Sequence, residues 1–167
     1  MATARLFGAM TLTDIAPVAA LPTTTAHFCI WNGEKVGGKT YTITSIGIVI
    51  TTSAAAAIVL QLLAQVAPNN TVPVISGTAA SAALALDGQG PGSRAMAASA
   101  VTIVNAGFWH PVGQSIVSAA TANIGLGSWV NVNGLYRIPP GGLFSLAGFC
   151  SAAGSAKCQL MATWSEA

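Results

Sequence analysis

Alternation of apolar and polar residues is clearest at the C-terminal end of the chain. Residues 157–166 read KCQLMATWSE, with Met161 as the one apolar residue out of phase. The apolar side chains at every second position are Cys158, Leu160, Ala162 and Trp164. A period of two is typical of a strand with one buried face. The pattern therefore predicts a half-buried antiparallel strand that carries Trp164 on its buried face.

The rest of the chain also reads as strands separated by turn residues. Residues 129–138 alternate in the same way, with Gly134 as an expected bulge or close approach. Other strands are expected at 27–31, 39–52 (with a register shift near 45–47), 57–66, 79–86 and 99–109. The stretch 54–67 is ambiguous, because its Leu and Gln residues favour a helix while its context favours a strand. About seven or eight strands with Gly-, Pro- and Asn-rich connections predict an all-β antiparallel sandwich or barrel.

The buried core of this sandwich can be named from the apolar faces of the expected strands. Trp164 is placed there by its alternating strand. The expected core residues are Ile43, Ile48, Leu60, Ile103, Val132, Tyr136, Leu160 and Trp164.

A double proline and double glycine interrupt the alternation at residues 139–142. Pro139 and Pro140 each fix their own φ and push the preceding residue into an extended conformation. Gly141 and Gly142 can adopt φ values that are closed to other residues. The sequence therefore predicts a rigid structural corner between two strands.

Residues 1–25 lack periodicity and contain Pro17 and Pro22. We expect an extended N-terminal arm here, followed by a β-sandwich domain at 26–167. Its apolar residues are too numerous to be left in water and are the candidate partner-binding residues: Leu6, Phe7, Met10, Leu12 and Ile15. The favoured hypothesis is that the arm lies along a neighbouring subunit, and the alternative is that it packs on its own sandwich.

Charged residues are scarce, which makes some classes of binding partner unexpected. Only 6% of the residues are charged, the formal net charge is +2, and there is no basic run. An average soluble domain has about 25% charged residues. The chain is therefore expected to bury much of its surface in an assembly or a membrane, and direct nucleic-acid binding is not expected. Residues 45–67 are long enough for a membrane helix, but Gln61 and Gln65 argue against one.

No pattern indicates catalysis, a metal or a cofactor. The four acidic residues form no pair on one strand face, and His27 and His110 are isolated. A platform for sugar binding could be built from Trp31, Trp109, Trp129 and Trp164, although such residues more often pack in a core. Buried free thiols are favoured for Cys29, Cys150 and Cys158, with a bridge between the last two left open. Cys150 and Cys158 flank residues 151–157, which are expected to form the loop of a terminal hairpin. We expect a protein that is not an enzyme.

Two segments resemble small virion proteins of tailed bacteriophages. The C-terminal run LYRIPPGGLFSLAGFCSAAGSAKCQLMATWSEA is similar to their last two strands, which follow a proline–glycine corner and end in a Thr–Trp–Ser/His–Glu pattern. The run CIWNGEKVGGKTYTITSIG resembles their entry into the sandwich. Together the resemblance covers residues 27–52 and 129–166.

The resemblance implies a jelly-roll-like sandwich in a structural virion component. The expected function is that of a capsid decoration (cement) protein, a homotrimer that binds the major capsid protein without cofactor, metal or membrane. Such proteins assemble in the cytoplasm of the host bacterium, which agrees with free thiols. The alternatives are another head- or tail-associated protein, a membrane-associated protein and a carbohydrate-binding module.

Overall fold

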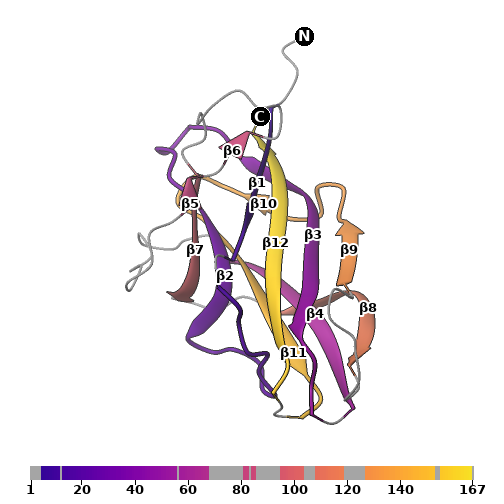
Figure 1. Cartoon of the computed structure of the whole chain (residues 1–167). Coiled ribbons are helices and arrows are strands. Elements are labelled where there is room, and N and C mark those ends of the chain that lie inside the picture. The colour runs from indigo at the N-terminus through magenta and orange to yellow at the C-terminus, as the bar shows by residue number, and fades with distance from the viewer. Residues whose placement is uncertain are drawn as a thin grey trace.

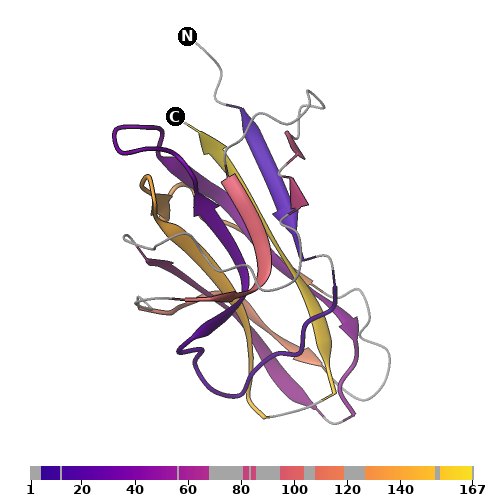
Figure 2. The same cartoon turned by 90° about the vertical axis from the view of Figure 1, so that its left-hand side faces the viewer.

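The computed structural model describes residues 5–11, 13–55, 57–67, 81–82, 84–85, 95–103, 108–118, 127–152 and 155–166. Over these residues the chain forms strands and no helix. The strands build two antiparallel sheets that pack face to face (Figures 1 and 2). The expected all-β antiparallel sandwich is therefore confirmed.

The described residues contain twelve strands, more than the seven or eight expected. Sheet A consists, in spatial order, of β9 (Gly127–Asn131) and β10 (Arg137–Ile138), both beside β3 (Tyr41–Thr52), then β12 (Lys157–Glu166), β1 (Leu6–Met10) and β6 (Leu84–Ala85). Sheet B consists of β5 (Ser81–Ala82), β7 (Ala95–Thr102), β2 (Thr25–Asn32), β11 (Leu143–Cys150), β4 (Ile58–Ala67) and β8 (His110–Ser118). The excess arises because β1 and β8 lie outside the expected strands, and the expected strands 79–86 and 129–138 are each divided into two.

In two parts of the chain, successive strands alternate between the two sheets. Strands β2, β3 and β4 belong to sheets B, A and B, and strands β10, β11 and β12 belong to A, B and A. In Figure 2 the orange β11 and the yellow β12 accordingly lie in different layers. The connection after Cys150 therefore crosses the sandwich, and the sequence-based interpretation of β11 and β12 as a terminal hairpin is wrong.

The apolar stretch 45–67 contributes to both sheets. Its first part belongs to β3 and its second part to β4, so the alternatives of a short helix and of a membrane helix are wrong. In the described part of the chain, no helix has the length and apolarity needed to span a bilayer.

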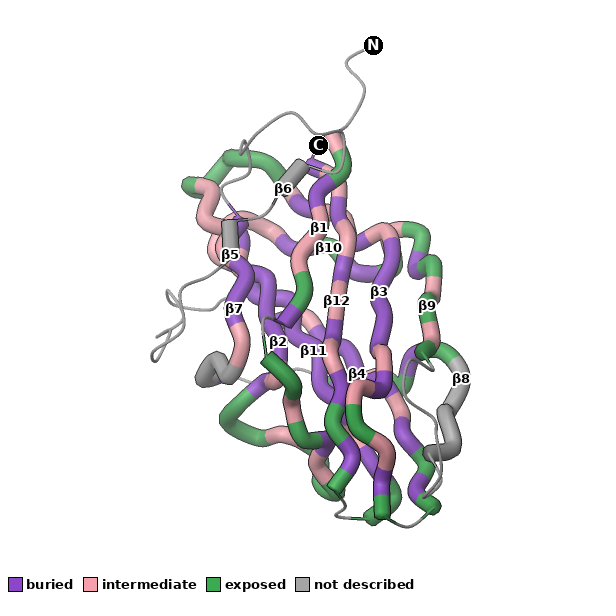
Figure 3. Tube along the Cα trace, viewed as in Figure 1, coloured by how far each residue is buried: buried purple, intermediate pink, exposed green. Residues whose placement is uncertain are grey.

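Strand β12 lies in the middle of sheet A, between β3 and β1. Its burial alternates along its whole length, as the sequence predicts (Figure 3). Opposite it, β3 contains an extra residue at Thr44, because Thr163 pairs with Ser45 whereas Trp164 pairs with Ile43. The expected register shift in β3 is thus confirmed, and it keeps Ile43 and Ile46 on the buried face.

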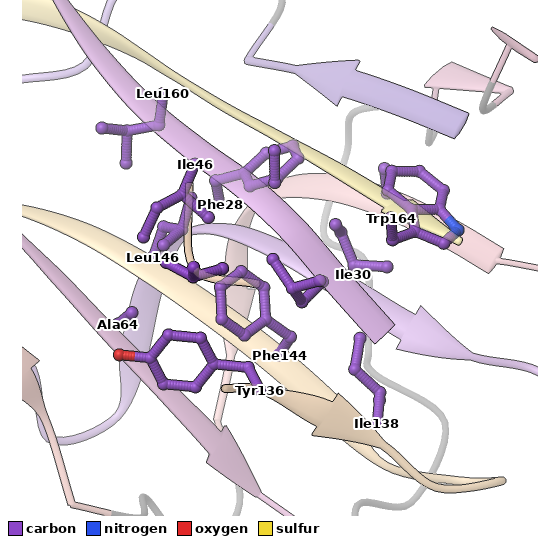
Figure 4. Packing of buried hydrophobic residues seen from close by; sticks show 14 of the residues in the cluster. Phe28, Ile30, Ile46, Ala64, Tyr136, Ile138, Phe144, Leu146, Leu160 and Trp164 are labelled. Atoms are coloured by element: carbon purple, nitrogen blue, oxygen red, sulfur yellow. The ribbon is translucent and has the colours of Figure 1, made fainter. Parts of the chain in front are cut away.

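All eight residues expected in the core are buried. Six of them belong to the main cluster between the sheets, together with Phe28, Ile30 and Phe144. Figure 4 shows this cluster, in which side chains from both sheets meet. A smaller cluster on the other face of sheet B includes Cys29, Leu63, Trp109 and Leu143. Sheet B therefore carries buried apolar residues on both faces.

The N-terminal segment packs on its own sandwich. Strand β1 pairs with β12 from Leu6↔Ser165 to Met10↔Met161. Phe7 is 1% exposed, and its ring stacks on Trp164 with centroids 6.0 Å apart. Further along, Ile15 exchanges backbone hydrogen bonds with Cys158. The expectation of an arm that leaves the sandwich is wrong for these residues, because a strand pairing within the chain already satisfies their backbone groups.

The corner at 139–142 is a tight turn that carries the chain from sheet A to sheet B. The Gly142 amide donates to the Pro139 carbonyl at 2.8 Å, and Gly141 has a φ of +77°. The two central residues of this turn are Pro140 and Gly141. A turn whose first central residue is proline and whose second has a positive φ is of type II, and it requires glycine or asparagine at the second central position. The corner is therefore present, although the strand before it, β10, has only two residues.

The expected irregularity at Gly134 is larger than a single-residue bulge. Strands β9 and β10 both pair with β3, and residues 132–136 lie opposite only Ile43 and Thr44. Asn133 and Gly134 have φ values of 44° and 80°, and the Leu135 amide donates to the Val132 carbonyl at 2.9 Å. Two successive positive φ values define a type I′ turn, for which Asn-Gly is the preferred sequence. We call residues 132–136 the bulge loop.

The three cysteines are free and buried, as favoured from the sequence. Burial raises the pKa of Cys29 and of Cys158 to about 12, and for Cys158 the nearby Asp14 and Cys150 add to this rise. Because the thiolate is the reactive form, we expect Cys29 and Cys158 to react slowly with an aromatic disulfide reagent at pH 8 in the native protein. All three thiols should react in denaturant. Rapid labelling of either residue in the native protein would contradict this prediction.

Candidate functional site

An open groove of about 670 Å³ lies beside the end of β4, where it meets the start of β8 and the bulge loop. The two sheets both contribute to it, since β4 and β8 belong to sheet B and the bulge loop follows β9 of sheet A. The side chains that give it chemical character are Gln65, Phe108, His110, Leu135, Tyr136 and Arg137. We call this feature the β4 groove.

Gln65 is the most unusual residue of the β4 groove. It is 1% exposed, yet neither its amide nitrogen nor its amide oxygen has a hydrogen-bond partner. It pairs across the sheet with Ser145, whose hydroxyl already contacts the Cys29 thiol at 3.4 Å. A buried polar group without a partner costs about 1–3 kcal/mol. Its pairing with Ser145, next to Cys29, places the Gln65 side chain on the outer face of sheet B, where the fold accepts this cost.

Tyr136 brings a second polar atom of the same kind. The bulge loop places its ring against Phe144, with centroids 5.3 Å apart. Its hydroxyl is buried and has no partner, and in Figure 4 it points away from the Phe144 ring. Burial raises the pKa of this phenol, so it stays protonated and can donate at neutral pH.

A row of rings leads from solvent to the core along the β4 groove. The Phe108 ring is 78% exposed and meets His110 edge-on at 4.8 Å between centroids. His110 in turn lies 5.9 Å from Tyr136. Because Tyr136 is anchored in the core by Phe144, this row links an exposed aromatic ring to the buried Tyr136 hydroxyl.

The charged and basic side chains of the β4 groove are Arg137 and His110. Among the described residues of its lining there is no carboxylate, thiol or aliphatic hydroxyl. The described lining thus combines hydrogen-bond donors and acceptors, an aromatic surface and a cation. Such groups can contact a ligand through an aromatic face, a hydrogen bond and a charge.

The residues predicted as sites from the sequence lie elsewhere. Of the expected arm residues, Phe7 is buried, Leu6 and Met10 are 38% and 42% exposed, and Ile15 packs against the main cluster. Leu12 lies outside the described residues. The exposed pair Leu6 and Met10 remains a candidate contact surface, whereas Phe7 is not available to a partner.

The tryptophans do not form a shared platform. Trp164 is fully buried, Trp109 is 8% exposed and donates through its ring nitrogen to the Pro22 carbonyl, and Trp31 packs against the cluster on the outer side of sheet B. Trp129 is 52% exposed and covers Gly47 on the outer side of sheet A. The bulky ring leaves no room there for a side chain on Gly47.

His27 has a structural role. Its Nδ1 accepts a hydrogen bond from the Gly148 amide at 3.1 Å, which requires the neutral ring, and burial lowers its pKa from 6.5. As the pH falls below 6.5, the unfolded chain binds a proton before the folded chain does. We therefore expect the free energy of unfolding to decrease between about pH 7 and pH 5.

The matched variant for this prediction is His27→Asn, whose side-chain oxygen can accept the same hydrogen bond without titrating. Urea unfolding of both proteins across this pH range measures the effect. Equal pH dependence in the two proteins would show that His27 does not contribute.

No family model, curated protein or solved structure matches this chain. In the described part of the chain, no group of three or more His, Cys, Asp or Glu side chains could hold a metal ion. Function must therefore be inferred from the fold and its surfaces.

Proposed function

We propose that this chain is a structural, non-enzymatic protein of a bacteriophage virion, a capsid decoration protein that binds the major capsid shell as a homotrimer. The observation that carries the proposal is where the resembling segments lie. Residues 27–52 and 129–166 supply β2 and β11, which are neighbours in sheet B, and β3 and β12, which are neighbours in sheet A. Two segments far apart in sequence thus form the centre of both sheets.

The order of the strands supports the finer, jelly-roll-like description. In that architecture the chain passes repeatedly between two sheets, as β2 to β4 and β10 to β12 do here. The low charge of the chain supports a role in an assembly, because surfaces with few charges are protected from aggregation by being covered. Exposed apolar residues available for such contacts include Leu6, Met10, Leu21 and Val59.

The proposal is tested with particles of the phage whose genome encodes the chain. Mass spectrometry of purified particles should find the chain in numbers comparable to the major capsid protein, released without detergent. Sedimentation of the isolated protein should give three times the 16.7 kDa chain mass. Recovery in the membrane fraction, or absence from purified particles, would refute the proposal. Recovery with a different stoichiometry in isolated tails would favour a tail-associated protein.

A further inference from the structure

We propose that the exposed Trp129 ring on the outer face of sheet A binds a neutral saccharide, which lays one sugar ring against the indole and hydrogen-bonds through its hydroxyl groups to the amides of Asn131 and Gln159. This inference is independent of the proposed virion role, because it concerns a site within one chain.

The Trp129 side chain points away from the core. Val130, the next residue of β9, packs against the main cluster between the sheets, so Trp129 and Asn131 on either side of it point outward. Trp129 is 52% exposed and pairs with Gly47 of β3, which in turn pairs with Met161 of β12. The ring therefore lies at the β9 end of a row of residues that crosses the outer face of sheet A.

The sheet beneath the ring fixes its position. A Cβ atom at Gly47 would overlap the six-membered part of the Trp129 ring and would lie 3.1 Å from Cγ of Met161. The ring thus occupies the space that glycine leaves free, against the backbone of β3 and beside a methionine. Because this position is set before a ligand arrives, little conformational entropy is lost on binding.

A hollow of about 300 Å³ adjoins the ring. It is lined by Val49, Gly127 and Met161 in addition to Trp129, and its volume is at the lower end of the range for small-molecule sites. The C–H face of a pyranose is flat and apolar. Stacking this face on the exposed indole removes apolar surface of both from water, which favours binding.

Polar side chains flank the ring on both sides. Asn131 lies two residues from Trp129 on the same strand, is exposed, and pairs across the sheet with Ser45. Gln159 is partly exposed on the outer face of β12 and pairs with Val49, which lines the hollow. An amide offers donors on its nitrogen and an acceptor on its oxygen, and a sugar hydroxyl can both donate and accept. These amides are therefore placed to bind the hydroxyl groups around a stacked sugar ring.

The lack of charge selects a neutral saccharide. Among the described residues, the three paired rows that contain Trp129, Asn131 and Gln159 include no charged side chain, so an acidic sugar finds no cation there. An apolar side chain of another protein is the rival occupant of the hollow. Such a partner would cover the flanking amides without giving them hydrogen bonds, which is unfavourable, whereas sugar hydroxyls satisfy them.

The test is an NMR titration of isotope-labelled protein with three neutral trisaccharides, cellotriose, maltotriose and chitotriose, with trigalacturonic acid as the acidic reference. At least one neutral trisaccharide should shift the indole N–H signal of Trp129 and the backbone amide signals of Gly47 and Gly127 in a saturable way, with a Kd of about 1 mM. The acidic trisaccharide should bind more weakly.

The variants separate stacking from hydrogen bonding, with the two glycine amides as the common readout. Trp129→Ala should weaken binding at least about tenfold, whereas Trp129→Phe keeps an aromatic face and should lose no more than about threefold. Asn131→Ala and Gln159→Ala should each weaken binding by about three- to tenfold. The matched control Phe108→Ala removes a ring that is 78% exposed from the β4 groove and should bind like the wild type.

Folding of the variants is checked separately. The changed side chains are exposed or partly exposed, so the thermal midpoints should stay close to that of the wild type. Loss of binding in a folded variant then reports on the site.

Four results would overturn the proposal. These are the absence of saturable shifts with all three neutral trisaccharides and of binding on an array of neutral glycans, equal binding by Trp129→Ala, equal or tighter binding of the acidic trisaccharide, and binding that is lost in Phe108→Ala instead. Shifts of the Gly47 and Gly127 amides that depend on protein concentration alone and vanish in Trp129→Ala would assign this face to a contact between copies of the chain and also overturn it.

Discussion

Replacing Trp164 by alanine is expected to lower the free energy of unfolding by about 3–5 kcal/mol. The side chain is 0% exposed, stacks on Phe7 and lies on β12, the strand that joins β3 to β1. Its removal therefore leaves a large cavity between the sheets and exposes one face of Phe7 within it. Denaturant unfolding of the two proteins measures the difference.

Two variants control for the size of this effect. Trp129→Ala removes the same ring from a position that is 52% exposed and should cost less than about 1 kcal/mol. Trp164→Phe keeps most of the apolar volume and deletes a ring nitrogen that has no partner, so its cost should fall well below that of the alanine variant. A loss under about 1 kcal/mol for Trp164→Ala would mean that β12 presents its other face to the core.

Asn32→Ala should produce the second largest loss, about 2–4 kcal/mol. Asn32 is fully buried, and its amide nitrogen donates to the carbonyls of Lys39 at 2.8 Å and Ile138 at 2.9 Å. Its amide oxygen accepts from the Glu34 backbone at 3.0 Å. Alanine leaves these three backbone groups without their partner. The corner then depends on the two backbone hydrogen bonds that join residue 32 to Gly141 and Gly142.

The control is Asn131→Ala, which changes an exposed asparagine on β9 and should alter stability by no more than about 0.5 kcal/mol. Hydrogen exchange gives a second readout, because the amides of Gly141 and Gly142 should lose protection in Asn32→Ala before the rest of sheet B does. Unchanged protection at both amides would show that Asn32 does not hold the corner.

The sequence predicts the strands that alternate clearly between apolar and polar residues. It fails for segments whose structure depends on contacts with residues far away in the sequence. The buried face of β12 follows directly from alternation, and the corner follows from what proline and glycine allow. The pattern of 129–138 predicts a bulge at Gly134, whereas the Asn133-Gly134 pair forms a type I′ turn. The sequence does not predict that the chain passes to the other sheet after Cys150. A short loop has the same kind of composition whether it joins two strands of one sheet or strands of two sheets.

The first strand and the β4 groove show two further limits of the sequence. The pairing of β1 with β12 joins residues at opposite ends of the chain, for which a local pattern holds no information. The groove is lined by residues of β4, by Phe108 and His110 and by the bulge loop, which are far apart in the sequence and meet only through the fold.

The pairing of Leu6 with Ser165 also bears on how the protein is made. Translation delivers β1 well before β12, and the edge of β1 toward β12 stays open until β12 has left the ribosome. Contacts between such distant residues form slowly, and an unpaired strand in a chain with 6% charged residues invites association with other nascent chains. Completion of sheet A therefore waits for β12, and the yield of folded protein should depend strongly on expression temperature and on chaperones that shield β1.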